Sequence, residues 1–110
     1  MALPLQISFQ DFEPSDAVRA RISEEAEKLA RYCDRIISFR VVVSEPHRHH
    51  HKGRIFNVKL FITLPGGHEV VVNKLDNGDQ AHEDIYVTIR DAFTAAKRQL
   101  ADHLRKHRDH

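Results

Sequence analysis

The chain has 110 residues, of which 41% are hydrophobic and 30% charged, and its formal net charge is +1. This length and composition fit a single globular domain, residues 1–110, and exclude a disordered chain. No apolar run approaches the roughly 20 residues of a membrane-spanning helix, and the single cysteine, Cys33, excludes an internal disulfide. Because a basic and then apolar leader is also absent, we expect a cytoplasmic protein with no membrane partner.

Basic residues are concentrated in two blocks. Residues 31–59 contain seven basic and two acidic residues, and residues 93–110 contain five basic and two acidic residues. The segments 1–30 and 60–92 are net acidic. The two basic blocks can form one positive surface only if the fold brings them together.

The first third of the chain predicts a strand and then a helix. Leu5, Ile7 and Phe9 alternate with polar residues, as in a half-buried strand. Ser15 precedes a helical pattern and is the expected N-cap. The helix has one apolar stripe, on which a cysteine is expected to be a small buried hydrophobe and not a reactive thiol. The stripe comprises Val18, Ile22, Ala26, Leu29 and Cys33.

The middle of the chain predicts three strands. Residues 36–44 are β-branched and apolar, as in a central strand, and residues 46–53 form a polar loop. Apolar residues alternate again from Phe56 to Leu64. Pro65, Gly66 and Gly67 predict a tight turn into a last strand over residues 69–75, so these two strands should pair as a hairpin.

The last predicted element is a long helix after the polar connection 76–81. Asp84 is a good N-cap, and apolar residues recur at the helical period after it. The apolar positions are Ile85, Ile89, Ala92, Phe93, Ala96, Leu100 and Leu104. The other faces carry the basic residues Arg90, Lys97, Arg98, Arg105 and Lys106.

The element order is therefore β-α-β-β-β-α, which predicts an α+β fold. The strand-helix-strand start implies a crossover between two parallel strands, and the hairpin extends the sheet in the antiparallel sense. We expect a four-stranded mixed sheet with two helices packed on one face.

Catalysis is not expected from this sequence. No serine or cysteine lies on a sharp glycine-flanked turn that would expose a nucleophile. The pair Gly66-Gly67 is too short for a phosphate-binding loop and lies between two strands. We therefore expect neither an enzyme nor a cofactor.

Histidines cluster in the loop 46–53, at His47, His49, His50 and His51. Imidazoles bind zinc, copper and nickel, but a structural zinc site needs four ligands on a rigid frame. The interleaved Arg48, Lys52 and Arg54 would repel a cation. We favour an anion-facing loop without a metal site, and a metal-binding loop and a merely solvated loop stay open as alternatives.

Basic residues on the two predicted helices suggest a second part of an RNA-binding surface. Lys28, Arg31 and Arg35 lie at the end of the first helix and just after it, and Lys97, Arg98 and Arg105 lie on the second. If the helices pack side by side, these sets flank one groove. RNA can be recognised by its shape through such phosphate contacts. A generic RNA- or partner-binding module would use the same features.

Two long segments carry a resemblance to a known family: residues 15–44, and the run H-E-D-I-Y…R-Q-L within residues 82–100. Through them the chain resembles the bacterial ribosome hibernation-promoting factors, the family that includes ribosome-associated inhibitor A or protein Y. The resemblance extends from Leu5 to about Lys106. It implies the same β-α-β-β-β-α fold. It also implies binding to the small ribosomal subunit and its rRNA in the channel between head and body, where messenger and transfer RNA sites are blocked during stress.

The resemblance carries over to single residues. Lys28, in E-K-L, and Arg98, in R-Q-L, match basic positions of the family's helices, whereas Ala95 and Asp102 stand where family members are often basic. We expect the basic residues of the loop 48–54 to compensate. That loop and the connection 76–84 look like a subgroup in which a cold-shock-type domain follows. The chain is therefore expected to be either a short factor or part of a longer protein with a further C-terminal domain.

Overall fold

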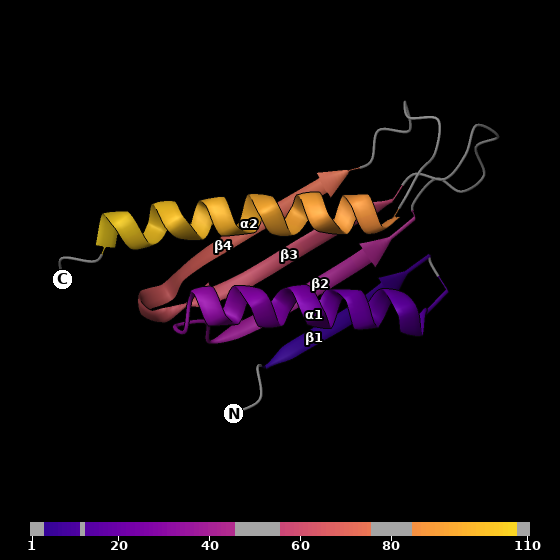
Figure 1. The fold of residues 1–110 in the computed structure, drawn as a ribbon, viewed down its shortest axis with the longest axis horizontal. Coiled ribbons are helices and arrows are strands. Elements are labelled where there is room, and N and C mark those ends of the chain that lie inside the picture. The colour runs from indigo at the N-terminus through magenta and orange to yellow at the C-terminus, as the bar shows by residue number, and fades with distance from the viewer. Residues whose placement is uncertain (1–3, 12, 46–55, 76–84, 108–110) are drawn as a thin grey trace.

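The computed structural model describes residues 4–11, 13–45, 56–75 and 85–107. Its elements occur in the predicted order (Figure 1): β1 (Leu5–Gln10), α1 (Asp16–Tyr32), β2 (Ser38–Ser44), β3 (Asn57–Leu64), a 3-10 turn (Pro65–Gly67), β4 (His68–Leu75) and α2 (Ile85–His107). The whole predicted loop 46–53, the connection 76–81 and the predicted cap Asp84 lie outside the described residues.

The four strands form one mixed sheet in the order β1-β2-β3-β4. β1 pairs with β2 in parallel, as the strand-helix-strand start predicts, and the other two pairs are antiparallel. Ile7, Val41, Leu60 and Val72 are partners at one level across all four strands. This register places the buried apolar residues of every strand on the same face.

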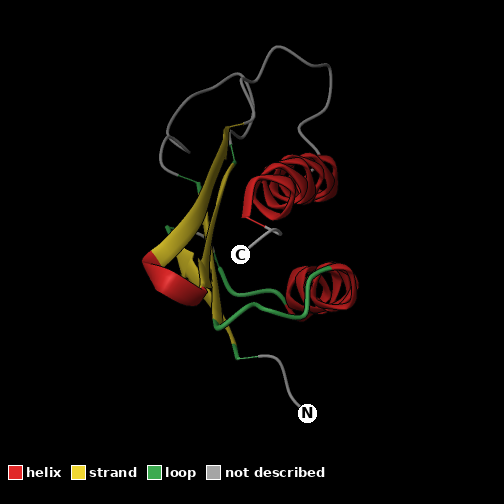
Figure 2. Ribbon diagram, turned by 90° about the vertical axis from the view of Figure 1, so that its left-hand side faces the viewer, coloured by secondary structure: helices red, strands yellow, loops and turns green. Residues whose placement is uncertain are grey.

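Both α1 and α2 cover that apolar face, and among the described residues neither α-helix lies on the opposite face of the sheet (Figure 2). The α1 stripe predicted from the sequence is buried in full, and Cys33 is only 2% exposed. On α2, Ile89, Ala96 and Leu100 are fully buried. The predicted α+β architecture is therefore confirmed, and Cys33 packs as part of the core.

Local chemistry explains where α1 begins and ends. The backbone N–H of Val18 donates to Ser15 Oγ over 3.2 Å, so Ser15 is the N-cap that the sequence predicts. At the other end the Cys33 N–H donates to the Leu29 carbonyl over 2.9 Å, and Cys33 itself is extended. The chain then turns back into β2, which begins at Ser38, two residues later than predicted.

The connection between β3 and β4 needs its two glycines. Gly66 and Gly67 have φ angles of +80° and +77°, values that residues with a Cβ rarely adopt. A Cβ on Gly66 would also lie 3.3 Å from a ring carbon of His68. The predicted hairpin is confirmed, with a short 3-10 turn preceding its second strand.

The two helices run side by side in the same direction, so their C-terminal ends lie at the same end of the molecule (Figure 1). Two contacts along the helices agree with this arrangement, since Arg21 meets Tyr86 and Tyr32 meets Lys97. Neither described helix is both long and apolar enough to cross a membrane. The arrangement brings the basic C-terminal part of α1 beside the basic half of α2.

Candidate nucleic-acid interface

One face of α1 looks toward α2. Arg21, Glu25, Lys28 and Tyr32 follow one another at helical spacing and therefore share a side of the helix. The Arg21 guanidinium carbon lies 5.1 Å from the centroid of the Tyr86 ring of α2. Lys97 Nζ of α2 lies 4.9 Å from the centroid of the Tyr32 ring. Lys28, which lies between these two contacts on α1, is therefore placed at the seam between the helices.

The predicted basic residues of α1 are all exposed, but their pairing differs. Lys28 Nζ lies 3.5 Å from Glu25 Oε2, one turn earlier on the helix. Arg31 lies in the last turn, and Arg35 follows the helix. Within the described parts of the chain, neither arginine pairs with a carboxylate. A cation in the last turn interacts favourably with the partial negative charge at the C-terminal end of a helix and so stabilises the helix. This is the purely structural explanation for Arg31.

On α2 the predicted basic residues occupy two sides. Lys97 faces α1 through its contact with Tyr32. Arg98 and Arg105 are seven residues apart on the side away from the buried Ala96 and Leu100, and both are exposed. Arg105 forms an ion pair with Asp102. The structure therefore brings Lys28 and Lys97 to one seam and leaves Arg98 and Arg105 on the outer surface of α2.

These ion pairs do not prevent contact with phosphate. Lys28 and Arg105 have side chains that are 60% and 64% exposed. Exposed pairs of this kind contribute at most about 1 kcal/mol, so a cation can exchange its carboxylate for a phosphate at little cost. The carboxylates still reduce the net positive charge of the surface.

Two further arginines at the seam were not predicted as binding residues. Arg21 precedes Lys28 by seven residues, and Arg90 precedes Lys97 by seven. Both line a hollow of about 220 Å³ between the helices, together with Tyr86. Each is exposed, and Arg90 pairs with Asp91 at 3.2 Å. The repeated spacing of seven, which keeps residues on one side of a helix, is the signal that could have identified them.

The rest of the predicted site lies outside the described residues. This applies to Arg48, Lys52 and Arg54 and to the four loop histidines, so their predicted role is untested. In the described segments no group of three or more histidine, cysteine or acidic side chains could hold a metal ion.

Comparison with known proteins places this geometry in a family. Residues 5–108 match the family described as sigma 54 modulation protein / S30EA ribosomal protein. The chain belongs to this family. The predicted resemblance to the protein Y and hibernation-factor group is therefore confirmed. No curated protein sequence matches the chain.

Two solved structures share the fold of this S30EA-family domain. The Thermus thermophilus Protein Y N-terminal domain has a TM-score of 0.64 at 24% identity, and the match covers 90% of this chain and 94% of that chain. A ribosomal subunit interface protein from Coxiella burnetii has a TM-score of 0.67 at 16% identity, with the same coverages. At these identities the structures support the fold and not individual residues.

Two departures from the expected family pattern can now be placed in this S30EA-family domain. Ala95 is half-buried and packs against the core. Its methyl side chain carries no charge, so this position adds nothing to the positive surface. Asp102 pairs with Arg105 and so offsets one of the predicted cations. The outer surface of α2 is therefore less positive than its content of basic residues indicates.

Proposed function

We propose that this protein is a ribosome hibernation factor that binds the small ribosomal subunit in the decoding channel. It represses translation there by occupying the sites of messenger and transfer RNA. The proposal rests on the membership of the S30EA ribosomal protein family. It also rests on one geometric observation, the meeting of basic side chains from α1 and α2 along a single seam.

The physical basis of binding is the release of counterions from rRNA. From Arg90 to Arg105 the basic residues of α2 span roughly 22 Å at the rise of an α-helix, which is enough to reach several phosphates. Lysines and arginines that replace condensed cations make the affinity fall steeply with salt. Arg21 and Lys28 of α1 lie along the same seam as Arg90 and Lys97, whereas Arg98 and Arg105 lie on the adjoining outer surface of α2. The ligand is therefore a shaped phosphate backbone and not a particular base sequence.

The first test is co-sedimentation with purified small subunits at low and high salt. We expect tight binding at low salt and a steep fall in affinity as salt rises. Binding that stays the same at both salt concentrations contradicts the electrostatic proposal. Large subunits and an RNA duplex serve as controls, because a generic RNA-binding module would bind them as tightly as the small subunit.

The second test concerns the location on the subunit. A filter-binding assay measures transfer RNA on small subunits that carry messenger RNA, with increasing amounts of the protein. We expect transfer RNA to be displaced, because both ligands need the same channel. If transfer RNA and the protein bind the same subunit together, the decoding-channel placement is wrong even though ribosome binding stands.

A further inference from the structure

The sheet face opposite the helices carries an ordered row of side chains. Gln6, Arg40, Phe61 and Val71 are register partners across all four strands, and all point away from the buried face. Neighbouring strands lie about 4.8 Å apart, so these side chains form a continuous band. In the described structure this face is separated from the α1 and α2 seam by the whole thickness of the sheet (Figure 2).

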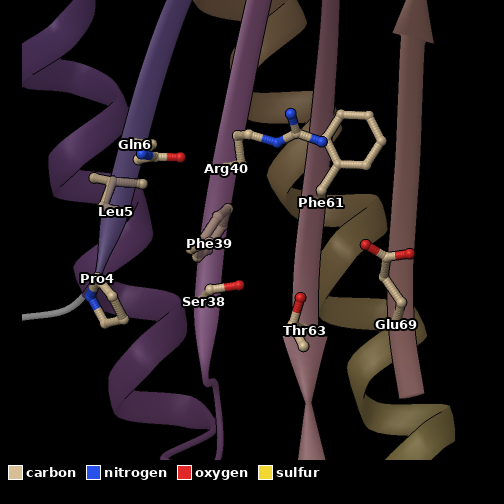
Figure 3. A pocket seen from close by; sticks show the side chains of 9 residues that line it. All are labelled: Pro4, Leu5, Gln6, Ser38, Phe39, Arg40, Phe61, Thr63 and Glu69. Carbon is tan, nitrogen blue, oxygen red and sulfur yellow. The ribbon is translucent and has the colours of Figure 1, made fainter. Parts of the chain in front are cut away.

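An arginine and an aromatic ring are stacked at the centre of this band. The Arg40 guanidinium carbon lies 4.5 Å from the centroid of the Phe61 ring, and the side chain reaches across from β2 to β3 (Figure 3). Phe61 is half-buried, and its partner Val71 is 46% exposed. A planar guanidinium on an aromatic ring offers a flat surface on which a nucleobase can stack.

A hollow of about 610 Å³ adjoins this stack. It lies where the next level of the sheet carries the small side chains Ser38 and Thr63, with Glu69 on β4 at its far side (Figure 3). The change from large to small side chains between adjacent levels creates the hollow. Two hydroxyl groups, one carboxylate and the Gln6 amide supply hydrogen-bonding groups around it.

The charges around the hollow favour one kind of ligand. Arg40, which lines the hollow, is cationic. Lys59 lies on the same face of the sheet but on the other side of Phe61 from Thr63 and the hollow. Glu69, on the opposite side of the hollow, repels a phosphate but accepts hydrogen bonds from the amino groups of a base. A nucleotide combines an anion, a flat ring and N–H donors, and so matches all three features.

We propose that this face binds an unpaired nucleotide of single-stranded RNA. The base stacks on Arg40 beside Phe61, its amino edge donates to Glu69, and the phosphate lies near Lys59. This site is separate from the helix surface of the proposed function, so either can fail while the other stands. The competing explanation is that Arg40 only shields Phe61 from water, in which case no RNA binds here.

The test uses the full chain and fluorescein-labelled RNA hexamers of cytidine and of uridine at low salt, followed by fluorescence anisotropy. We expect Phe61→Leu and Arg40→Lys each to weaken cytidine-hexamer binding roughly tenfold, the size of effect that losing one stacked base produces. Arg40→Lys keeps the charge, so this variant isolates the stacking surface. The wild type should bind the cytidine hexamer more tightly than the uridine hexamer, because only cytidine has an exocyclic amino group that can donate to Glu69. Glu69→Ala should reduce this difference in affinity.

The matched control is the double variant Lys28→Ala with Arg98→Ala, which removes two charges from the helix side. It should retain at least half of the wild-type hexamer affinity while losing affinity for small subunits. Circular dichroism checks that each variant is folded. Equal hexamer binding by wild type and by folded Arg40→Lys overturns the proposal, as does the absence of hexamer binding by the wild type.

Discussion

Lys97 of α2 lies over the ring of Tyr32, the last residue of α1, with its ammonium nitrogen 4.9 Å from the ring centroid. The contact joins two residues that are 65 positions apart in the chain. It shows that the C-terminal part of α1 meets the middle of α2, and it holds one cation at the seam between the helices.

The Tyr32–Lys97 contact should be measurable as a coupling energy. A double-mutant cycle with Tyr32→Leu and Lys97→Met should give a coupling of about 0.5–1 kcal/mol in the free energy of unfolding, the usual value for an exposed cation–π pair. Urea denaturation followed by circular dichroism measures it. Lys97→Met combined with Val71→Ala, on the other face of the sheet, should be additive. Additivity in the Tyr32–Lys97 cycle itself would show that the contact contributes nothing.

The core register of α2 depends on Ile89, which is fully buried. Ile89→Ala should lower the free energy of unfolding by about 2–5 kcal/mol, because it leaves a cavity that the close-packed core fills only in part. The control is Val87→Ala, at a position that is 39% exposed, which should change stability by no more than about 0.5 kcal/mol. Equal melting curves for Ile89→Ala and the wild type would contradict the register.

Removing the carboxylate of Asp102 should strengthen binding to small subunits. Asp102→Asn releases Arg105 from its ion pair and removes a negative charge beside the proposed rRNA surface. We expect modestly tighter binding, because Arg105 no longer has to give up a carboxylate to contact a phosphate and because the repulsion between Asp102 and rRNA is removed. Glu13→Gln, the same change of charge before α1, is the control. If both variants bind alike, the local pairing of Arg105 has no role in binding.

The basic loop and the helix surface should contribute comparable shares of ribosome binding. Replacing Arg48, Lys52 and Arg54 together with alanine should weaken binding about as much as replacing Lys28 and Arg98. The loop residues are predicted to compensate for the missing charges at Ala95 and Asp102. Each lost phosphate contact should make the salt dependence shallower by roughly one unit.

Co-sedimentation of both variants with small subunits at two salt concentrations gives this comparison. Both variants should keep the wild-type melting temperature. Lys28 and Arg98 are exposed, and the three loop residues are charged side chains in a polar segment that the sequence places outside the core. A loop variant that binds like the wild type, beside a helix variant that fails to bind, would show that the loop does not compensate.

The sequence by itself predicts the order of the elements, the N-cap at Ser15 and the buried stripes of both helices. Leu29 and Leu100, for example, are identified as core residues by their spacing alone. These features are local, because helical periodicity and capping depend on residues three or four positions apart. The hairpin is predictable for the same reason, since Gly66 and Gly67 are suited to the positive φ angles of the turn.

The tertiary structure decides which side chains of distant segments meet. Arg21 and Arg90 become candidates for RNA contact only because α1 and α2 pack in parallel, with Tyr86 and Tyr32 at their contacts. Arg40 and Phe61 become a stacked pair only through the register of β2 with β3. Strand register and helix packing are set by contacts between residues far apart in sequence, whose summed burial selects one arrangement. Local periodicity restricts the strand register to alternate residues and gives each helix its buried face, but it does not say which distant side chains meet.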